Sequence, residues 1–505
     1  MPSAVMPEEV PIPEPWGLPF LGHIAEFNPE NPLEDIHRLA DTFGEIYRLR
    51  FPGGKTLVIC STNALVNEVC DETRFQKTLN NVLKEVRSIA GDGLFTAKLD
   101  EPNWGIAHRI LIPAFGPVTI RGMFDEMHDI ATQMAMKWAR HGSSTPIMAT
   151  EDFTRLTLDT IALCAMDFRF NSYYREELHP FITAMGDALT ECGNRDRRPA
   201  IANYFFRGTE HKFFADIDLM RKTADEVLQA RKASPSDRKD LLAAMLNGVD
   251  PKTGQKMTDA SIIDNLITFL IAGHETTSGL LSFAFYELLK KPAAYQKAQQ
   301  EVDSVIGQGP ITIDHLTKLP YLNAVLRETL RLCATIPAFG VEAKEDTLLG
   351  GKYPVKKGEP ILCLLGKAHL DPVVYGDSAK DFVPERMLDE SFERLQKEFP
   401  NSWKPFGNGM RACIGRPFAW QEALLATAML LQNFSFTMDD PNYQLKIAES
   451  LTIKPKGFYM RAALRNGMSP TQLEHRLAGK ATTKLASRPA AASSQTNGHD
   501  TTTTA

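Results

Sequence analysis

The sequence predicts a mainly α-helical protein with small β-sheets, an α+β fold class. Three observations carry this prediction: most of the 505 residues show apolar positions at helical spacing, two short segments have the pattern of β-hairpins, and no internal repeat is present. Hydrophobic residues make up 43% of the chain, which is enough for a sizeable core. We therefore expect a globular protein over most of the chain.

In the first half of the chain, a β pattern gives way to helical patterns. Residues 11–22 are punctuated by prolines, and residues 48–60 are interrupted by a Pro-Gly-Gly sequence, so we expect an irregular start followed by a short hairpin. Helical periodicity follows at residues 120–140 and 218–232. The first half therefore predicts a small sheet and then helices.

The second half contains the longest helical pattern, at residues 258–290, where Thr258 or Asp259 can serve as the N-cap. Helical spacing recurs at residues 311–332, and residues 348–355 have the pattern of a second hairpin. This half therefore predicts long helices with one further small sheet.

The end of the chain has a different composition. From about residue 463 the helical patterning fades, and residues 480–505 are rich in Ala, Thr and Ser. Such a segment buries too little apolar surface to offset the entropy lost on ordering, so we expect a disordered tail or a linker. We place the boundary between a folded domain of residues 1–465 and a low-complexity segment of residues 466–505.

Charge and cysteine content exclude several classes of protein. The net charge of −6 argues against nucleic-acid binding as a main function. The 7 cysteines are scattered and odd in number, which indicates a reducing compartment without a disulfide framework. The N-terminus lacks the basic and apolar regions of a signal peptide, and no run of about 18 apolar residues occurs. We therefore expect a soluble, cytoplasmic protein without a membrane anchor.

The most informative segment is residues 406–415, a glycine-rich turn that ends in Cys413 and precedes an apolar helix. This is a layout for holding a haem iron through a thiolate, a ligand that favours cleavage of the O–O bond. Glycines let backbone N–H groups approach the sulfur. Arg411 can meet a haem propionate, and Phe406 can shield the sulfur from water.

This segment has two other interpretations. A cysteine in a glycine-rich loop is most often a buried structural residue. The spacing Gly407-x-Gly409-x-x-Ala412 also satisfies a dinucleotide-binding fingerprint, which would indicate a dehydrogenase. That fingerprint needs an apolar strand before the first glycine, whereas residues 402–406 contain a proline and have no apolar period. The dinucleotide reading is therefore disfavoured.

A second motif, residues 272–278, lies inside the long helical pattern and contains an acid–alcohol pair, Glu275 and Thr276. Adjacent threonine hydroxyls can bond back to helix carbonyls and bend or widen the turn. The His274-Glu275 dipeptide begins the H-E-x-x-H motif of zinc proteases, but the fifth position is Ser278, so the second histidine ligand is missing. A core helix with small polar residues is the simpler alternative.

The 406–415 segment resembles the haem-binding loop of the cytochrome P-450 superfamily, and the further motifs occur in the order that this superfamily shows. The resemblance implies one large haem domain with the cytochrome P-450 fold and haem b (iron protoporphyrin IX) as cofactor. It implies that Cys413 ligates iron, that Thr276 and Glu275 manage dioxygen and protons, and that Ala272 faces the haem.

Two more motifs support the resemblance. Glu328 and Arg331 lie three residues apart on one helix face, and with Arg386 they are expected to form a structural network behind the haem. Alone, such a pair is usually a surface contact worth a few tenths of a kcal/mol. Trp104 and His108 lie one helical turn apart, and with Arg411 and Lys77 the resemblance assigns them to the haem propionates. Many superfamily members have arginine at the position of His108.

Within the superfamily, the chain looks like the haem domain of the self-sufficient fatty-acid hydroxylases, bacterial and fungal, in which a diflavin reductase is fused to the haem domain. The similarity runs over about residues 11–465 and is carried by residues 91–96, 268–281, 343–347 and 404–415. It implies that FMN, FAD and NADPH act only through a reductase that is not in this chain. The alternative is a stand-alone enzyme with a polar tail.

The same resemblance implies an apolar substrate pocket. Its expected lining residues are Leu83, Val86, Ala90, Phe95, Ile336, Ala338 and Leu451, although core packing explains each of them equally well when taken singly. Phe95 would keep the chain terminus from the iron and direct attack to carbons just inside the end. The usual arginine and tyrosine at the channel mouth are replaced by Gly54 and Val58, so only Lys55 is left to meet a carboxylate.

The sequence therefore predicts an NADPH-dependent monooxygenase that hydroxylates medium- or long-chain fatty acids near the far end, with dioxygen and a diflavin reductase as its other partners. Fatty alcohols or other long amphipathic molecules are the alternative substrates. Two other classes stay open: a haem-thiolate protein that isomerises or reduces, and a haem sensor or carrier. The acid–alcohol pair at Glu275 and Thr276 argues against both. A homodimer is left open.

Overall fold

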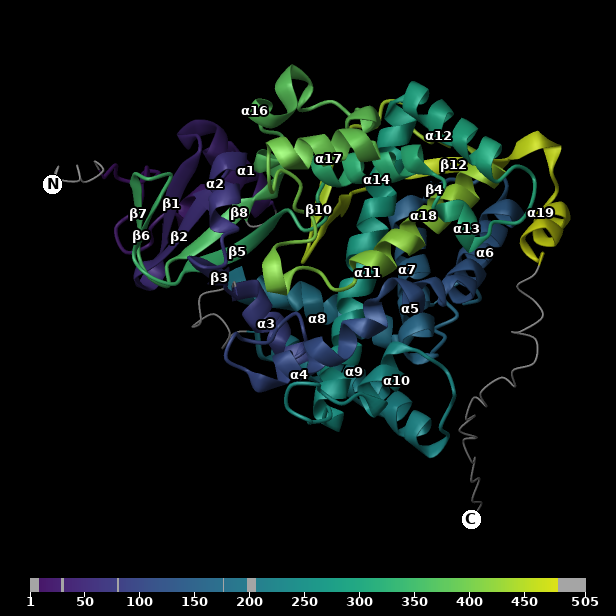
Figure 1. Ribbon diagram of the computed structural model, residues 1–505, viewed down its shortest axis with the longest axis horizontal. Coiled ribbons are helices and arrows are strands. Elements are labelled where there is room, and N and C mark those ends of the chain that lie inside the picture. Colours follow the sequence, from purple (N-terminus) through teal and green to yellow (C-terminus); the bar gives the residue numbers. More distant parts are fainter. Residues whose placement is uncertain (1–8, 29–30, 80, 176, 198–205, 480–505) are drawn as a thin grey trace, which may run out of the picture.

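The computed structural model describes residues 9–28, 31–79, 81–175, 177–197 and 206–479. Helices make up most of this part of the chain, and the larger β-sheet lies at one side, near the N-terminus (Figure 1). The predicted mainly helical fold class with small sheets is confirmed. Among the described residues, no helix combines the length and the apolar character needed to cross a membrane.

The larger sheet joins segments that are far apart in the sequence. Its strand order is β1-β2-β8-β5-β3, and β2 and β8 are the parallel neighbours while the other pairs are antiparallel. The β1–β2 pair is the hairpin predicted at residues 48–60. The strands are β1 (Ile46–Phe51), β2 (Lys55–Cys60), β3 (Phe75–Lys77), β5 (Ala338–Ala343) and β8 (Pro360–Leu364).

Three smaller sheets complete the β structure. The β6–β7 hairpin is the one predicted at residues 348–355. The β10–β11 hairpin carries Leu451 in its turn. The strands are β6 (Thr347–Leu349) with β7 (Tyr353–Val355), β10 (Ile447–Glu449) with β11 (Ile453–Pro455), and β4 (Ile147–Met148), β12 (Tyr459–Leu464) and β9 (Phe434–Met438).

The α-helices form the body of the molecule. They are α1 (Pro32–Phe43), α2 (Asn63–Val69), α3 (Asn81–Ala90), α4 (Pro102–Leu111), α5 (Pro117–Arg121), α6 (Phe124–His141), α7 (Ala149–Met166), α8 (Pro180–Arg197), α9 (Arg207–Ala233), α10 (Leu241–Asn247), α11 (Asp259–Lys290), α12 (Pro292–Val305), α13 (Ile313–Leu316), α14 (Pro320–Leu332), α15 (Leu365–Ala368), α16 (Pro372–Tyr375), α17 (Asp389–Glu398), α18 (Arg416–Asn433) and α19 (Pro470–Leu477).

Helix α11 is the centre of the core. Its N-cap is Thr258, as predicted, and the Thr258 hydroxyl accepts a hydrogen bond from the Ser261 N–H at 3.2 Å. The helix packs against α7, α9, α14 and α18, and most of its side chains are buried. Gly273 lets α7 come close, because a Cβ at this position would lie 2.8 Å from the Ile161 side chain. The predicted long helix therefore forms the axis around which the others pack.

Two predicted helices are each divided in the structure. Residues 120–140 are split between α5 and α6 at Gly122, and residues 311–332 are split between α13 and α14 just before Pro320. Proline lacks the N–H group that a helix interior needs, and it restricts the preceding residue to extended conformations. The periodicity continued across both breaks because the two helices bury faces in the same core.

The folded part of the chain extends beyond residue 465, the boundary that composition predicted. Helix α19 begins at a capping box in which Ser469 and Gln472 satisfy each other's backbone N–H groups. Leu473 and Leu477 are buried, and the helix packs against α6. Two leucines one turn apart are enough to dock a short capped helix, and a composition average does not detect this. Residues 480–505 lie outside the described residues.

Candidate active site

The loop that carries Cys413 is closed by its own backbone. The Cys413 N–H donates to the Phe406 carbonyl at 2.8 Å, and Gly407 and Gly409 have φ angles of +74° and +59°, which favour glycine. A Cβ at Gly409 would also lie about 2.1 Å from the Glu72 carboxylate. The chain then enters α18 directly. The loop therefore holds the thiol at the start of a buried helix.

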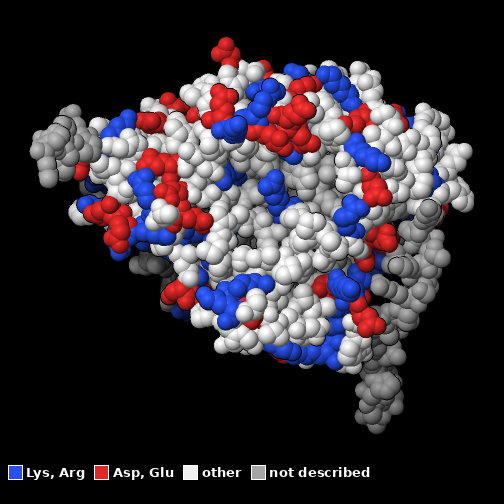
Figure 2. Space-filling view, in the orientation of Figure 1, with Lys and Arg blue, Asp and Glu red and all other residues white. Residues whose placement is uncertain are grey.

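The thiol faces a hollow inside the molecule. Among the seven cysteines Cys413 is the one with an exposed side chain, although protein surrounds it. Figure 2 shows that this face of the molecule is hollowed near its middle, with Lys and Arg side chains in the hollow. Burial raises the pKa of Cys413, while the N–H groups of Gly415 and Arg416 donate to the sulfur and oppose that rise. These donors would stabilise a thiolate.

Aromatic rings cover the loop on its other side. Phe406 packs against Trp403 and Trp420, with ring centres 6.0 Å apart in both pairs. The Arg416 guanidinium lies 5.5 Å from the centres of the Phe406 and Trp403 rings. Phe406 therefore lies among other aromatic rings next to the loop, and its expected role of shielding the sulfur from water stays a prediction.

Helix α11 lies close to the cysteine loop. Phe115 connects them: it is 3.9 Å from the place where a Cβ at Gly415 would stand, and its ring is 5.7 Å from the ring of Phe269 on α11. One turn beyond Phe269, Ala272 is exposed in the middle of an otherwise buried helix. Ala272 is therefore an exposed position on the part of α11 that Phe115 connects to the cysteine loop.

The Thr276 hydroxyl donates to the Ala272 carbonyl at 2.9 Å, the back-bonding expected from the sequence. Helix α11 nevertheless continues as a single α-helix from Asp259 to Lys290. Thr276 is partly exposed, whereas Thr277 is buried. Of the two threonines, only Thr276 can therefore present its hydroxyl to a molecule in the hollow.

Glu275 is held in a network that no sequence motif indicated. Its carboxylate accepts from Lys454 Nζ at 2.9 Å and from Thr452 Oγ1 at 2.9 Å, both on the segment that follows Leu451. His274 Nε2 lies 3.1 Å away. Burial opposes ionisation of Glu275, but Lys454 and His274 outweigh it and hold its pKa well below the usual range. Glu275 is therefore an anion at neutral pH and only a weak proton acceptor.

A group of partly buried basic side chains lies beside the cysteine loop. Arg411 donates to the Ala97 carbonyl at 2.7 Å and stacks on Trp104, whose ring centre is 4.5 Å away. Its second nitrogen, Nη1, is buried without a hydrogen-bond partner. Trp104 stacks in turn on His108, with ring centres 4.6 Å apart. In this stack, Arg411 Nη1 can donate a hydrogen bond to an anion.

Lys77 belongs to the same group of basic side chains. Its ammonium donates to the Phe95 carbonyl at 3.0 Å, and burial, together with the charge of Arg411, lowers its pKa to about 7. Burial and Arg411 also lower the pKa of His108. Within the described part of the chain, neither Lys77 nor Arg411 forms an ion pair with a carboxylate. Such uncompensated buried cations are costly unless an anionic ligand pairs with them.

A model of the cytochrome P450 family matches residues 11–462. The chain belongs to the cytochrome P450 family. It is 66% identical over 479 residues to the bifunctional cytochrome P450/NADPH–P450 reductase of Fusarium oxysporum, a match that covers 95% of this chain and 45% of the relative. A protein of the same description from Aspergillus oryzae is 58% identical over 473 residues, with 92% and 42% covered.

A third relative is a self-sufficient cytochrome P450 monooxygenase of Exserohilum turcicum. It is 53% identical over 477 residues, a match that covers 94% of this chain and 44% of the relative. The chain thus spans less than half the length of these curated relatives. The resemblance to a cytochrome P450 that is fused to a reductase is confirmed.

The haem that the cytochrome P450 family implies fits this hollow. Cys413 would hold its iron through sulfur, and the small, exposed side chain of Ala272 on the nearby helix α11 would leave room for it. The buried, unpartnered Nη1 of Arg411 and the buried ammonium of Lys77 suit the two carboxylates of a haem. Trp104 and His108 stack beside them. The donor set and the room match a haem bound through sulfur.

The cytochrome P450 chain also contains the buried ion-pair network predicted from Glu328, Arg331 and Arg386. Glu328 and Arg331 have no solvent exposure, and their side chains form two hydrogen bonds of 2.7 and 2.8 Å. Arg386 Nε lies 3.3 Å from the same carboxylate. Arg331 also donates to the carbonyl of His369, whose imidazole accepts from the Lys404 N–H at 2.9 Å. The network therefore reaches the segment that leads into the cysteine loop.

The expected substrate residues lie on several segments of this cytochrome P450. Leu83, Val86 and Ala90 are buried on α3, whereas Phe95 is only partly buried. Ile336, Ala338 and Leu451 are also partly buried. Lys55 is exposed at the start of β2, directly after Gly54 at the hairpin turn.

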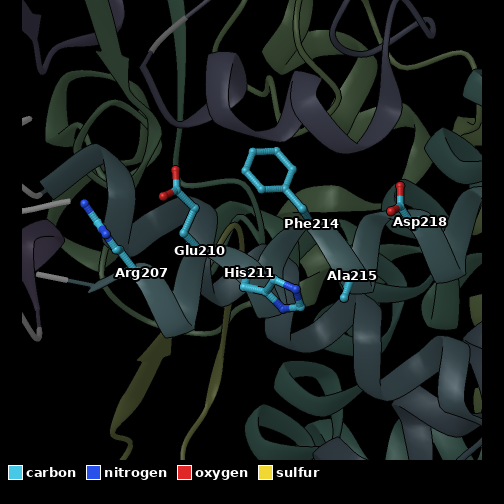
Figure 3. Close-up of a pocket in the computed structure, with 6 residues that line it drawn as sticks. All are labelled: Arg207, Glu210, His211, Phe214, Ala215 and Asp218. Carbon is cyan, nitrogen blue, oxygen red and sulfur yellow. The ribbon is translucent and has the colours of Figure 1, made fainter. Parts of the chain in front are cut away.

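A separate groove of about 620 Å³ runs along the first turns of α9. Its lining residues are Arg207, Glu210, His211, Phe214, Ala215 and Asp218, and none of them belongs to the predicted site (Figure 3). This groove therefore does not enter the account of the active site.

Proposed function

We propose that this cytochrome P450 chain is a haem-thiolate monooxygenase that hydroxylates fatty acids at carbons near the far end. One oxygen atom of dioxygen enters a C–H bond, the other leaves as water, and NADPH supplies two electrons through a diflavin reductase. The single observation that carries the proposal is the Cys413 thiol, which accepts from two N–H donors and is exposed although protein surrounds it. Bound haem would supply the activation of dioxygen.

Other groups of the chain would stabilise the sulfur, hold the haem and handle protons. The Gly415 and Arg416 N–H groups support the negative charge on sulfur. Arg411 and Lys77 would neutralise the carboxylates of the haem, and the Trp403, Phe406 and Trp420 rings would keep water from the sulfur. The Thr276 hydroxyl would orient a water or dioxygen, and the Glu275 carboxylate would orient water that relays protons on that side of α11.

The test is a fatty-acid titration of the haem-loaded chain that follows the spin state, together with product analysis after addition of a diflavin reductase and NADPH. We expect a high-spin shift with dodecanoic acid and hydroxylated products at several positions, because one methylene in an apolar pocket is worth only about 1–3 kcal/mol. A chain that binds haem but yields no hydroxylated fatty acid would contradict the proposal.

Replacing Thr276 by alanine should uncouple electron use from hydroxylation. We expect haem to bind as before, while product formed per NADPH falls severalfold and hydrogen peroxide rises by the matching amount, because the hydroxyl that directs protons is gone. The measurement compares the amount of NADPH consumed with the amounts of hydroxylated product and hydrogen peroxide formed. Thr277→Ala is the matched control, since it removes a buried hydroxyl on the same helix. Normal coupling in Thr276→Ala would rule out the proton role.

Fatty alcohols are the second candidate substrates, because Gly54 and Val58 offer no side chain to a carboxylate. Replacement of Lys55 by alanine tests whether the protein binds the carboxylate head group of a fatty acid through this side chain. If Lys55 pairs with a carboxylate, dodecanoic acid should bind about 1.5- to 5-fold more weakly, in line with roughly 0.2–1 kcal/mol for an exposed ion pair. Dodecanol should be unaffected, and Lys256→Ala controls for the lost surface charge. Equal losses for acid and alcohol would exclude Lys55 as an anchor.

A further inference from the structure

The loop that carries Phe95 lies directly against α11. A Cβ at Gly91 would stand 2.0 Å from Oδ2 of Asp264, and one at Gly93 would stand 2.1 Å from Oγ1 of Thr268. Gly91 also has a φ angle of +53°. The backbone of the loop can therefore approach the helix only because both positions are glycine.

Two side chains of α11 bind this backbone. Oδ2 of Asp264 accepts from the Asp92 N–H at 3.2 Å, and Oδ1 of Asn265 accepts from the Leu94 N–H at 3.1 Å. Asp264 is held in turn by Arg221 of α9, whose Nη1 donates to Oδ1 at 2.8 Å. The residue just before Phe95 is thus hydrogen-bonded to the central helix.

Asn265 is fixed from both ends of its amide. It is fully buried, and its Nδ2 donates to the Ser261 carbonyl one turn earlier at 2.8 Å. With that donor engaged, only Oδ1 is left to face Leu94. A buried amide with both ends satisfied holds one orientation, because any other orientation would leave a buried polar atom without a partner.

The other side of the loop is held as well. Lys77 donates to the Phe95 carbonyl, and Arg87 donates to the Thr96 carbonyl at 3.0 Å. The Thr96 hydroxyl closes the loop on the Gly91 carbonyl at 2.9 Å. The backbone on either side of Phe95 is therefore fixed, and only the torsions of its own side chain are left to vary.

We propose that Asn265, supported by Asp264, is a positioning residue that sets where Phe95 stands and thereby selects the carbon that is hydroxylated. The proposal rests on the function proposed above. Neighbouring carbons of an alkyl chain differ little in their barriers, and a difference of about 1.4 kcal/mol already changes a product ratio tenfold. A small displacement of Phe95 is therefore enough to redistribute the products.

The test uses Asn265→Leu, which keeps the number and branching of the side-chain heavy atoms and removes the acceptor of the Leu94 N–H. Two quantities are measured on the haem-loaded chain: hydrogen exchange of the peptide that covers residues 91–97, and the positional isomers formed from dodecanoic acid with reductase and NADPH. We expect exchange to rise at least about fivefold, as loss of one net hydrogen bond predicts, and the ratio of neighbouring isomers to change at least twofold.

Asn433→Leu is the matched control. Asn433 is also fully buried, donates to the carbonyl one turn earlier (Met429, 2.8 Å) and accepts from a partner, Arg476 at 3.0 Å, but it lies on α18. This variant should lower the melting temperature without changing either quantity.

Unchanged exchange in Asn265→Leu would overturn the claim that Asn265 holds the loop. Faster exchange with unchanged isomers would overturn the claim that the loop selects the carbon. If the wild-type chain makes no hydroxylated fatty acid, the proposed function fails. In that case the exchange measurement still decides whether Asn265 holds the loop.

Discussion

Cys413→Ala should abolish the thiolate-type spectrum that the reduced protein gives with carbon monoxide, and with it all hydroxylation. No other described cysteine can replace the ligand, because Cys413 alone has its side chain exposed to the hollow. The N–H groups of Gly415 and Arg416, which stabilise charge on sulfur in the wild type, would then have no anion to meet. The expected loss is complete rather than partial.

The measurement has three parts: the carbon monoxide difference spectrum, the haem content, and the far-UV circular dichroism of the same preparation. Cys70→Ala is the matched control, since this thiol is only partly exposed and burial raises its pKa to about 11. It should keep the spectrum. A thiolate-type spectrum in folded Cys413→Ala would show that another residue holds the iron, and the proposed function would lose its basis.

Much of this fold was predictable because its strongest signals are local. Apolar spacing located α11, and the glycine turns located both hairpins. The helix breaks at Gly122 and Pro320 were missed although both residue types interrupt helices, since the apolar period continued across them. Helix α19 was missed because two buried leucines do not alter a composition average.

Some residues of the candidate site were also predictable from the sequence, and others were not. Motif spacing was enough to predict roles for Cys413, Arg411 and Thr276, since each lies in one short segment with recognisable chemistry. The partners of Glu275 were not predictable, because Lys454 and Thr452 lie nearly 180 residues away on a two-stranded hairpin with no motif of its own. Long-range pairs of this kind depend on how the elements pack, and a single sequence does not specify that.

The ion pair between Glu328 and Arg331 was only partly predictable. Its three-residue spacing was evident from the sequence, but its burial was not. An exposed pair at this spacing contributes a few tenths of a kcal/mol, whereas breaking a buried pair costs about 3–5 kcal/mol because the remaining charge is left without a partner. Both side chains are fully buried here. Arg331→Met should therefore lower the free energy of unfolding by an amount in the larger range.

Three further acceptors strengthen this expectation. Arg331 also donates to the carbonyls of His369, Ala379 and Asp381, and all three lose their donor in the variant. Because Lys404 and His369 connect this network to the cysteine loop, haem content should fall along with stability. Denaturant unfolding and haem content of the purified variant are the measurements.

Arg121→Met is the matched control for Arg331→Met. Arg121 pairs with Asp314 at 2.7 Å, but both side chains are exposed, so its loss should cost no more than about 1 kcal/mol. The double variant Glu328→Leu with Arg331→Met should recover part of the lost stability, because it removes the stranded carboxylate. If Arg331→Met and Arg121→Met lose the same small amount, the network has no structural role, and the reason for its burial must be sought in the haem site itself.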